Sequence, residues 1–338
     1  MMKQSYFRIV FLGFLVLGFL FPLTSGAADK KIVVKISDTE VLNSNAFNAL
    51  KFMGEIVGTK TGNQMVFEYY PQAVLSAGKV QTMIEQCQMG SLEAISLSTI
   101  QFTNYLPELQ VVSLPLLFDN FAQAYQTGKS PAAKELLVSF DKIGMVGLSA
   151  WTRSLRQFLH AKKFLLTPAD FQGQKIRVPE IKLFVSFFKS FGAVVTPMTW
   201  GEVFTALQLG AIDGLEQGTD NIYTEKLYEV VKYLTLCDYT GDWKVIAFSK
   251  KFWGTLTPAQ QKILMEAAEQ AQDEKYRLDK NSIEIDMGRL KEKGMQIQQM
   301  SPQQKELFRP YAQKVWTEFE PVIGKEIMNK MLRTVGKR

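Results

Sequence analysis

Histidine is almost absent from this sequence, and its scarcity bears on catalysis. The 338 residues include a single histidine, His160. Most proton-transfer schemes and many metal sites depend on histidine. The sequence also lacks the Gly-x-Ser-x-Gly elbow, the Gly-x-x-x-x-Gly-Lys-Ser/Thr phosphate loop and the Gly-x-Gly-x-x-Gly dinucleotide fingerprint. We therefore expect no enzyme, no metal and no cofactor. We interpret His160, which lies next to Lys162 and Lys163, as a surface or packing residue.

Cysteine is scarce too, and charge of neither sign is gathered into blocks. Cys87 and Cys237 lie far apart in the sequence, each among apolar residues. One disulfide and two buried free thiols are both compatible with this arrangement. The net charge is +6, with the two signs interspersed and no basic tract of the nucleic-acid-binding type. We expect no nucleic-acid partner, whereas a mildly positive balance could assist the capture of anions.

Only one stretch is long and apolar, and it lies at the N-terminus. Residues 1–8 are short and basic, residues 9–23 are almost wholly apolar, and residues 24–27 are mostly small. This is the pattern of an export signal, with cleavage after Ala27 or Ala28. The apolar run of about fifteen residues is shorter than the roughly twenty that span a bilayer, and no cysteine follows it to carry a lipid. We expect residues 1–27 to be removed as a signal peptide, leaving an exported, soluble protein.

One arginine lies in a setting typical of an anion-binding site. Residues 175–179, Lys-Ile-Arg-Val-Pro, indicate a short strand in which Ile176 and Val178 share one face and Arg177 points to the other. The next helix is apolar and ends at Gly192, so we expect the strand to lie in a packed α/β layer. A buried guanidinium needs an anionic partner, and a ligand carboxylate can accept two parallel hydrogen bonds from it. The spacing alone leaves open a structural salt bridge within the fold.

Two blocks around this arginine resemble the signature of a transport-receptor family. They read TPADFxGxKIRVP from Thr167 to Pro179 and PMTWGEVFTALQxGxxDGxE from Pro197 to Glu216. Together they resemble the extracytoplasmic solute receptors of tripartite ATP-independent periplasmic (TRAP) transporters, the C4-dicarboxylate-binding type of family. The resemblance runs from about Lys31 to about residue 320, and the two blocks in combination are highly specific.

The resemblance implies an α/β fold of two lobes, as in periplasmic binding proteins. A ligand cleft would lie between the lobes, with a hinge and a long inter-lobe helix. The length agrees, since 338 residues exceed what one core organises. Strands and helices alternate in the first half, which favours sheets covered by helices on both faces. The expected lobes are residues 28–153 with 243–282 and residues 154–242 with 283–338.

Two segments are expected to be largely helical. By resemblance, residues 213–233 hold a strand end followed by the long helix that bridges the lobes. Further on, two capping patterns, Thr257-Pro258-Ala259-Gln260 and Ser301-Pro302-Gln303-Gln304, predict helix starts. We expect helices over residues 258–291, with a possible break, and 302–332, with a strand over residues 295–299 between them.

The resemblance also assigns ligand contacts in the second lobe. Arg177 is expected to clamp the ligand carboxylate, and Arg156 to touch the same group, with Arg153 as the alternative three residues earlier. Two guanidinium groups can satisfy a desolvated carboxylate, which is costly when unpaired. Gln217 stands where relatives commonly carry asparagine and can still donate from its amide. Trp200 stands where the family often places a ring that stacks on the ligand, and the alternative is that Trp200 covers the following helix.

The first lobe is expected to contact the rest of the ligand. Its strand ends present Thr39 and Ser98. In the sialic-acid-binding branch of the family an acidic residue lies near the Ser98 position, so a serine there argues against a sugar acid. Trp151 and Trp243 lie near the predicted lobe crossings. If they line the cleft, the ligand is an aromatic or apolar monocarboxylate such as an aromatic or branched keto acid; the alternative is that both rings belong to the core.

The resemblance therefore implies a monomeric periplasmic receptor that captures an organic acid, closes on it and delivers it to TRAP permease subunits. Three alternatives remain open from the sequence. The first is a C4-dicarboxylate or sugar-acid receptor of the same family. The second is a receptor of the same shape that serves a signalling partner. The third, an exported enzyme acting on organic acids, is disfavoured because the usual catalytic motifs are absent.

Overall fold

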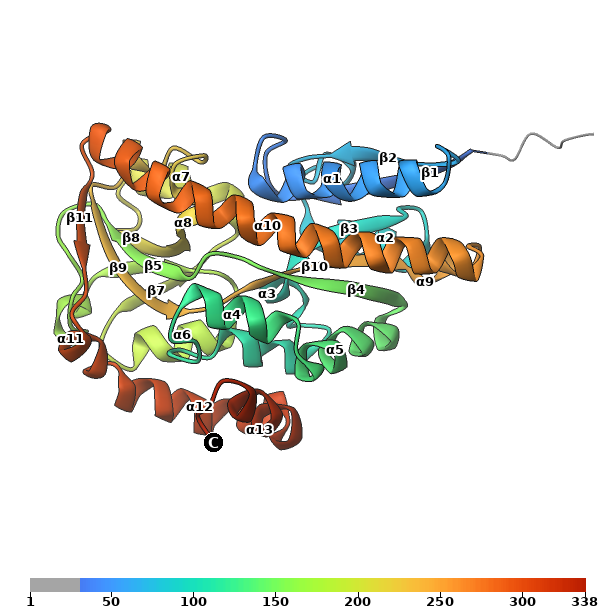
Figure 1. Cartoon of the computed structure of the whole chain (residues 1–338). Helices are drawn as coiled ribbons and strands as arrows, with labels where there is room; N and C mark the ends of the chain where they lie inside the picture. The colour runs from blue at the N-terminus through green and yellow to red at the C-terminus, as the bar shows by residue number, and fades with distance from the viewer. Residues whose placement is uncertain (1–30) are drawn as a thin grey trace, which may run out of the picture. The chain divides into compact units, whose positions relative to one another are not determined.

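The chain folds around two mixed β-sheets, each covered by helices (Figure 1). The computed structural model describes residues 31–338, and the predicted signal peptide at residues 1–27 lies outside them. The first sheet has the strand order β2-β1-β3-β10-β4, and the second has the order β11-β9-β5-β8-β6-β7. The predicted α/β class with two sheets is confirmed. Within the described part of the chain, no helix is both long enough and apolar enough to cross a membrane.

The first sheet and its helices come from the N-terminal half and one returning strand. Its strands are β1 (Ile32–Asp38), β2 (Met65–Tyr70), β3 (Ala94–Ser98), β4 (Met145–Thr152) and β10 (Trp243–Ser249). The helices of this part are α1 (Asn45–Lys60), α2 (Val80–Met89), α3 (Thr99–Phe102), α4 (Phe121–Gly128), α5 (Pro131–Val138) and α9 (Lys250–Trp253), with the 3-10 segment η2 (Pro107–Ser113). Strands β1, β2 and β3 pair in parallel, whereas β10 runs antiparallel to β3 and β4.

The second sheet contains the strand that carries Arg177. Its strands are β5 (Arg156–His160), β6 (Lys175–Val178), β7 (Val194–Pro197), β8 (Gly214–Gly218), β9 (Tyr233–Thr240) and β11 (Gln296–Gln299). Its helices are α6 (Lys182–Lys189), α7 (Trp200–Gln208) and α8 (Thr219–Ile222). The predicted strand at residues 175–179 is confirmed as β6. It lies between β7 and β8, and Arg177 pairs in register with Thr196 and Leu215.

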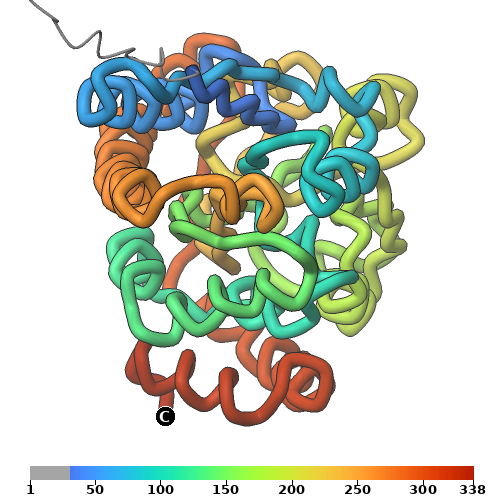
Figure 2. The backbone as a smooth tube through the Cα atoms, turned by 90° about the vertical axis from the view of Figure 1, so that its right-hand side faces the viewer, coloured from blue at the N-terminus to red at the C-terminus, as the bar shows by residue number. Residues whose placement is uncertain are grey.

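One long helix runs beside both sheets, but it is not the helix expected from the resemblance. Residues 213–233 contain only β8, the four-residue helix α8 and a short 3-10 turn, so the prediction of a long helix there is wrong. The long element is α10 (Pro258–Glu292), 35 residues without a break, which packs against α1, β4 and α8. Figure 2 shows α10, in orange, alongside α1, in blue. Its start was predicted correctly because Thr257 and Gln260 form a reciprocal capping box.

The C-terminal helices pack against elements of both sheets. The strand expected at residues 295–299 is confirmed as β11, and the helical segment after it divides into α11 (Pro302–Glu306), α12 (Arg309–Ile323) and α13 (Lys325–Thr334). Helix α12 contacts both η2 and α6, while α13 contacts η2 and α5. Lys330 adds an ion pair to Glu135 at 2.8 Å. The C-terminus therefore joins the helices of one sheet to the helices of the other.

Phenylalanine dominates the packing between the second sheet and its covering helices. The aromatic cluster includes Phe158 on β5, Phe171 before β6, and Phe187 and Phe188 on α6, all buried. Their rings meet mostly edge to face at centroid distances of 5.0 to 5.8 Å, a geometry favoured by the aromatic quadrupole. The helix that follows β6 thus fixes the strand from one side, which leaves the opposite side of β6 to present Arg177.

Candidate functional site

Arg177 lies on β6 with its guanidinium held by a neutral backbone group. The residue is 3% exposed. Its Nε and Nη2 donate to the carbonyl oxygen of Met198 at 3.0 and 2.6 Å. Met198 follows β7, and the parallel pairing of β6 with β7 brings its carbonyl alongside the arginine. The guanidinium also lies 5.6 Å from the ring centroid of Trp200, within the range of a cation–π contact.

The charge of Arg177 has no close carboxylate partner. Among the described residues, no acidic side chain comes within 4.0 Å of its guanidinium. Burial lowers the pKa of Arg177 to about 10, although the more distant Glu216 raises it and the neighbouring Arg156 lowers it further. An arginine that is desolvated without a counter-charge is costly to the fold. An anion placed on this guanidinium would offset that cost.

Arg156, the predicted second contact, is paired inside the protein. It opens β5, opposite Gly218 of β8. Its Nε and Nη2 bind the two carboxylate oxygens of Glu216 on β8, with 2.8 Å between Nη2 and Oε1. Burial would lower the pKa of Arg156, but the charge of Glu216 raises it instead. Tyr239 donates its hydroxyl to Glu216 at 2.7 Å. The structure thus places Arg156 in a bidentate ion pair, and its contact with a ligand stays a prediction.

Arg153, the alternative to Arg156, joins three carboxylates from three segments. Its Nε is 3.2 Å from Asp220, its Nη1 is 3.2 Å from Asp242, and its Nη2 is 3.6 Å from Glu40. Burial would lower the pKa of Arg153, but Asp220, Glu40 and Asp242 raise it well above its usual range. The side chain is 9% exposed. Arg153 lies between β4 of the first sheet and β5 of the second, so its ion pairs are made where the chain passes from one sheet to the other.

A buried lysine extends this set of charges into the first sheet. Lys244 on β10 binds both carboxylate oxygens of Asp38 at 2.7 Å and Glu40 at 2.8 Å. Burial would raise the pKa of Glu40, but Lys244 and Arg153 lower it to about 2. We call the eight connected side chains the inter-lobe ion network. They are Asp38, Glu40, Arg153, Arg156, Glu216, Asp220, Asp242 and Lys244.

Sequence reasoning missed most of this network. Asp242 and Lys244 flank Trp243 at a predicted lobe crossing, and Asp38 and Glu40 flank Thr39 at a strand end. The charged residues at these chain crossings could have indicated a buried ion network. The sequence does not show which of them pair, since Lys244 and Asp38 are 206 positions apart.

The predicted polar contacts of the first lobe lie beside these charges. Ser98 donates its hydroxyl to the carboxylate of Asp242 at 2.8 Å, and Thr99 does the same at 3.0 Å. An acid thus stands next to Ser98 although position 98 itself is a serine. Thr39 is half-buried between Asp38 and Glu40. The structure therefore brings Ser98 to the inter-lobe ion network, and Thr39 lies next to two members of the network in the sequence.

Gln217 lies on β8, the strand beside β6, and Trp200 lies on the helix α7 that follows β7. The side-chain oxygen of Gln217 accepts from the backbone N–H of Gly218 at 2.8 Å, and within residues 31–338 its amide nitrogen has no protein partner. That nitrogen is the group expected to donate to the ligand. Trp200 opens α7 and is half-buried beside Arg177.

The other two tryptophans predicted to contact the ligand, Trp151 and Trp243, are both buried, in different surroundings. Trp151 is fully buried, packs with the core of the first sheet and donates its indole N–H to the carbonyl of Ala268 on α10 at 3.0 Å. This matches the alternative that the ring belongs to the core. Trp243 is 1% exposed, and its indole nitrogen has no hydrogen-bond partner among the described residues. Such a donor usually finds an acceptor when it is buried.

The single histidine and the two cysteines are buried. His160 ends β5, is buried, and accepts at Nδ1 from the backbone N–H groups of Lys162 and Lys163; it is a packing residue. Cys87 and Cys237 are both free and buried, and burial raises the pKa of each thiol. In residues 31–338, no group of three or more histidine, cysteine or acidic residues could hold a metal ion.

The chain is similar to known solute-binding proteins over most of its length. The family model described as bacterial extracellular solute-binding protein, family 7, matches residues 36–321. A solute-binding protein of Verminephrobacter eiseniae is 30% identical over 274 residues, which are 81% of this chain and 80% of that protein. The C4-dicarboxylate-binding protein DctB of Bacillus subtilis is 26% identical over 304 residues, 89% and 86% of the two chains.

Solved structures agree with these matches. The sugar acid binding protein of Advenella mimigardefordensis, crystallised with galactonate, has a TM-score of 0.86 and 27% identity, covering 91% of this chain and 99% of that one. A TRAP periplasmic solute-binding protein of Polaromonas, bound to D-erythronate, has a TM-score of 0.83 and 28% identity, covering 89% and 98%. The family match spans most of the chain, and a sequence relative of 30% identity supports it. The chain therefore belongs to the bacterial extracellular solute-binding proteins of family 7, the non-enzymatic receptors of TRAP transporters.

Proposed function

We propose that this protein captures an organic acid in the periplasm and delivers it to the membrane subunits of a TRAP permease. The observation that carries the proposal is Arg177. It is buried, fixed by the Met198 carbonyl and by its place in the sheet, and without a carboxylate within 4.0 Å among the described residues. Its neighbour Arg156, equally buried, already pairs with Glu216 through Nε and Nη2. An anionic ligand would supply the counter-charge that Arg177 lacks.

The ligands of relatives support an acid as the recognised group. The Bacillus subtilis relative is named for binding C4-dicarboxylates, and the two solved structures hold galactonate and D-erythronate. These compounds differ in length and in hydroxylation but share a carboxylate. A receptor that keeps one arginine for that carboxylate can vary the rest of its contacts.

Electrostatics favours a ligand with one carboxylate over a dicarboxylate. The inter-lobe ion network holds five carboxylates against three cations, all with side chains less than a tenth exposed. Each of these cations already has a carboxylate within 3.2 Å. A second acidic group on the ligand would meet an excess of negative charge and no free cation there.

Two chemistries fit the non-acid end of the ligand. The first is the apolar or aromatic end of a keto acid, which the sequence predicts if Trp151 and Trp243 line the cleft. Trp151 gives it no support, because its ring is fully buried in the core, and Trp243 is only 1% exposed. The second is a hydroxylated end, as in a sugar acid. The Asp242 carboxylate beside Ser98 favours it, because a carboxylate can accept hydrogen bonds from ligand hydroxyls.

A thermal-shift screen of the mature protein against keto, hydroxy, sugar and dicarboxylic acids tests the proposal. We expect at least one monocarboxylate to raise Tm, and Arg177→Ala to weaken its binding by about 2–5 kcal/mol, since the ligand charge would be left unpaired. Lys175→Ala is the matched control, because it removes a positive charge from an exposed position of the same strand. We expect the control to bind as the wild type does. Equal binding by wild type and Arg177→Ala would refute the role of Arg177.

A further inference from the structure

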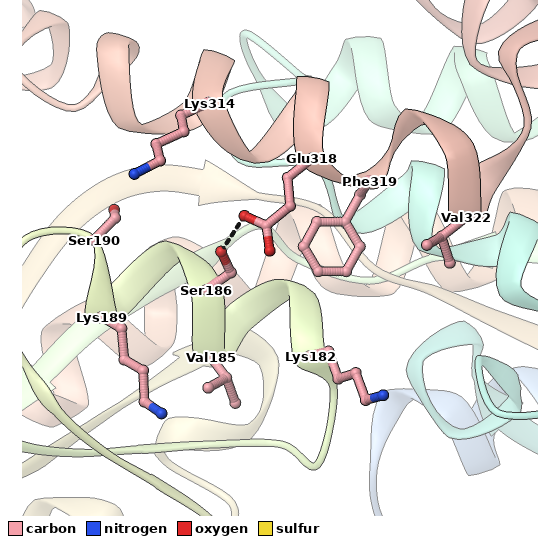
Figure 3. Close-up of a pocket in the computed structure, with 9 residues that line it drawn as sticks. All are labelled: Lys182, Val185, Ser186, Lys189, Ser190, Lys314, Glu318, Phe319 and Val322. Atoms are coloured by element: carbon pink, nitrogen blue, oxygen red, sulfur yellow. Dashed lines mark hydrogen bonds between the residues drawn. The ribbon is translucent and has the colours of Figure 1, made fainter.

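A groove lies between two helices, and none of the predicted ligand-binding residues lines it. Helices α6 and α12 form its walls, and its volume is about 630 Å³ (Figure 3). Its apolar part consists of Val185, Phe319 and Val322. Val322 is 49% exposed, although valine is an apolar residue. We call this feature the α6–α12 groove.

Positive charge surrounds the groove. Lys182, Lys189 and Lys314 line it, and all three are exposed. In the described part of the chain, none of them has a carboxylate within 4.0 Å, unlike Lys330 with its two acidic partners. Figure 3 shows Lys182 and Lys189 at opposite ends of α6 and Lys314 reaching from α12 toward Ser190.

The one carboxylate of the groove is turned inward. Glu318 accepts a hydrogen bond from the hydroxyl of Ser186 at 2.5 Å, across the two helices. With three lysines and one glutamate, the lining carries two net positive charges. An apolar floor beside three lysines without ion pairs among the described residues is complementary to a segment with both acidic and apolar side chains.

The two walls of the groove are attached to different parts of the molecule. Helix α6 starts at Lys182, four residues after β6 ends at Val178, so it follows the strand that carries Arg177. Helix α12 is tied instead to the segment after η2, because Trp316 donates its indole N–H to the carbonyl of Pro115 at 2.9 Å. A shift of β6 relative to that segment would therefore change the shape of the groove.

We propose that the α6–α12 groove is the docking surface for an acidic, amphipathic segment of the membrane permease. Carboxylates of that segment would pair with Lys182, Lys189 and Lys314, and an apolar side chain would cover Val322. Charge complementarity of this kind accelerates association and selects the partner. The inference rests on the proposed function, because it takes the permease as the partner.

The experiment compares two triple variants in the source organism, which supplies the permease. K182E/K189E/K314E reverses the groove charges, and K251E/K280E/K291E reverses three exposed lysines on α9 and α10 that also lack ion pairs. The substrate is the radiolabelled acid that gives the largest thermal shift. We expect the groove variant to lose uptake by roughly tenfold or more while its Tm and ligand-induced shift stay unchanged. The control variant should transport like the wild type.

Three outcomes would overturn the docking surface. They are undiminished uptake by the groove variant, an equal loss in both triple variants, and sedimentation of the wild type but not the groove variant with vesicles containing phosphatidylglycerol, which would assign the groove to lipid. A failure of the proposed function is recognised separately, because the wild-type protein would then show no thermal shift with any acid.

Discussion

At the scale of single residues, two buried arginines of one sheet differ in what they meet. Arg156 forms a bidentate pair with Glu216, whereas the guanidinium of Arg177 donates to the Met198 carbonyl and lies over the Trp200 ring. The two arginines are equally buried, at 3% exposure each. Burial without a counter-charge lowers the pKa of Arg177 to about 10, and the adjacent carboxylate raises the pKa of Arg156. Arg156 therefore has its counter-charge within the protein, whereas we propose that the ligand supplies one for Arg177.

This difference predicts opposite costs of substitution in the ligand-free protein. Glu216→Gln leaves Arg156 buried without its carboxylate, and we expect it to lower the free energy of unfolding by about 3–5 kcal/mol. Arg177→Met removes a desolvated charge and keeps the apolar stem, and we expect a loss of about 1 kcal/mol or less. Urea denaturation of both variants measures the difference. A loss in Arg177→Met as large as that in Glu216→Gln would show that Arg177 is structural.

At the scale of elements, the start of α10 depends on local sequence signals and its course on long-range packing. Its start is set locally by the Thr257 capping box and by Pro258 at the first helical position. Its course is set by packing against α1 and β4, and by Gln272, whose amide donates to the carbonyl of Ala150 at 2.8 Å and accepts from Ser149 at 2.9 Å. The helix therefore connects elements that are distant in the sequence.

A glycine inside α10 offers a clean test of this element. Gly288 lies within the helix, and a Cβ there would meet nothing within 4 Å. We expect Gly288→Ala to raise the free energy of unfolding by about 0.5–1 kcal/mol, because alanine loses less conformational entropy in a helix. Gly214→Ala on β8 is the contrast, since a Cβ there would lie 2.5 Å from the carbonyl oxygen of Leu159. In thermal or urea unfolding, we expect Gly288→Ala to be more stable than the wild type and Gly214→Ala to be less stable.

At the scale of the whole molecule, the chain passes between the two sheets at the predicted positions near 153 and 243. Strand β4 of the first sheet ends at Thr152 and β5 of the second begins at Arg156, while β9 ends at Thr240 and β10 begins at Trp243. The inter-lobe ion network lies at these crossings. The lobe limits of residues 28–153 with 243–282 and 154–242 with 283–338 remain a prediction, and the contacts of α13 with α5 and η2 show that the C-terminus also reaches elements of the first sheet.

Two lobes that close on a ligand predict a change of size in solution. We expect small-angle X-ray scattering to show a smaller radius of gyration when the mature protein is saturated with its acid, because closure is driven by contacts made only in the closed form. Arg177→Ala at the same ligand concentration should keep the radius of the free protein. An identical scattering profile with and without saturating ligand would contradict closure.

Part of the candidate site could be predicted from the sequence and part could not. Strand periodicity set Arg177 on the opposite face from Ile176 and Val178, and the structure places it there, buried and unpaired with any described carboxylate. The pairing of Arg156 and Arg153, the burial of Trp151 and the acid beside Ser98 were beyond the sequence pattern. These features depend on partners 60 to 144 positions away, and periodicity carries no information about them.

The sequence by itself determined the short-range features: the strands and helices that capping residues and glycine exits delimit, the α/β class and, through its two motif blocks, the family. The tertiary structure alone decided that the helix beginning at Pro258 packs against elements of both sheets, and which buried arginine has no carboxylate within 4.0 Å among residues 31–338. The physical reason is that caps and alternation act within a few residues, whereas desolvation and ion pairing depend on groups that only the folded chain brings together.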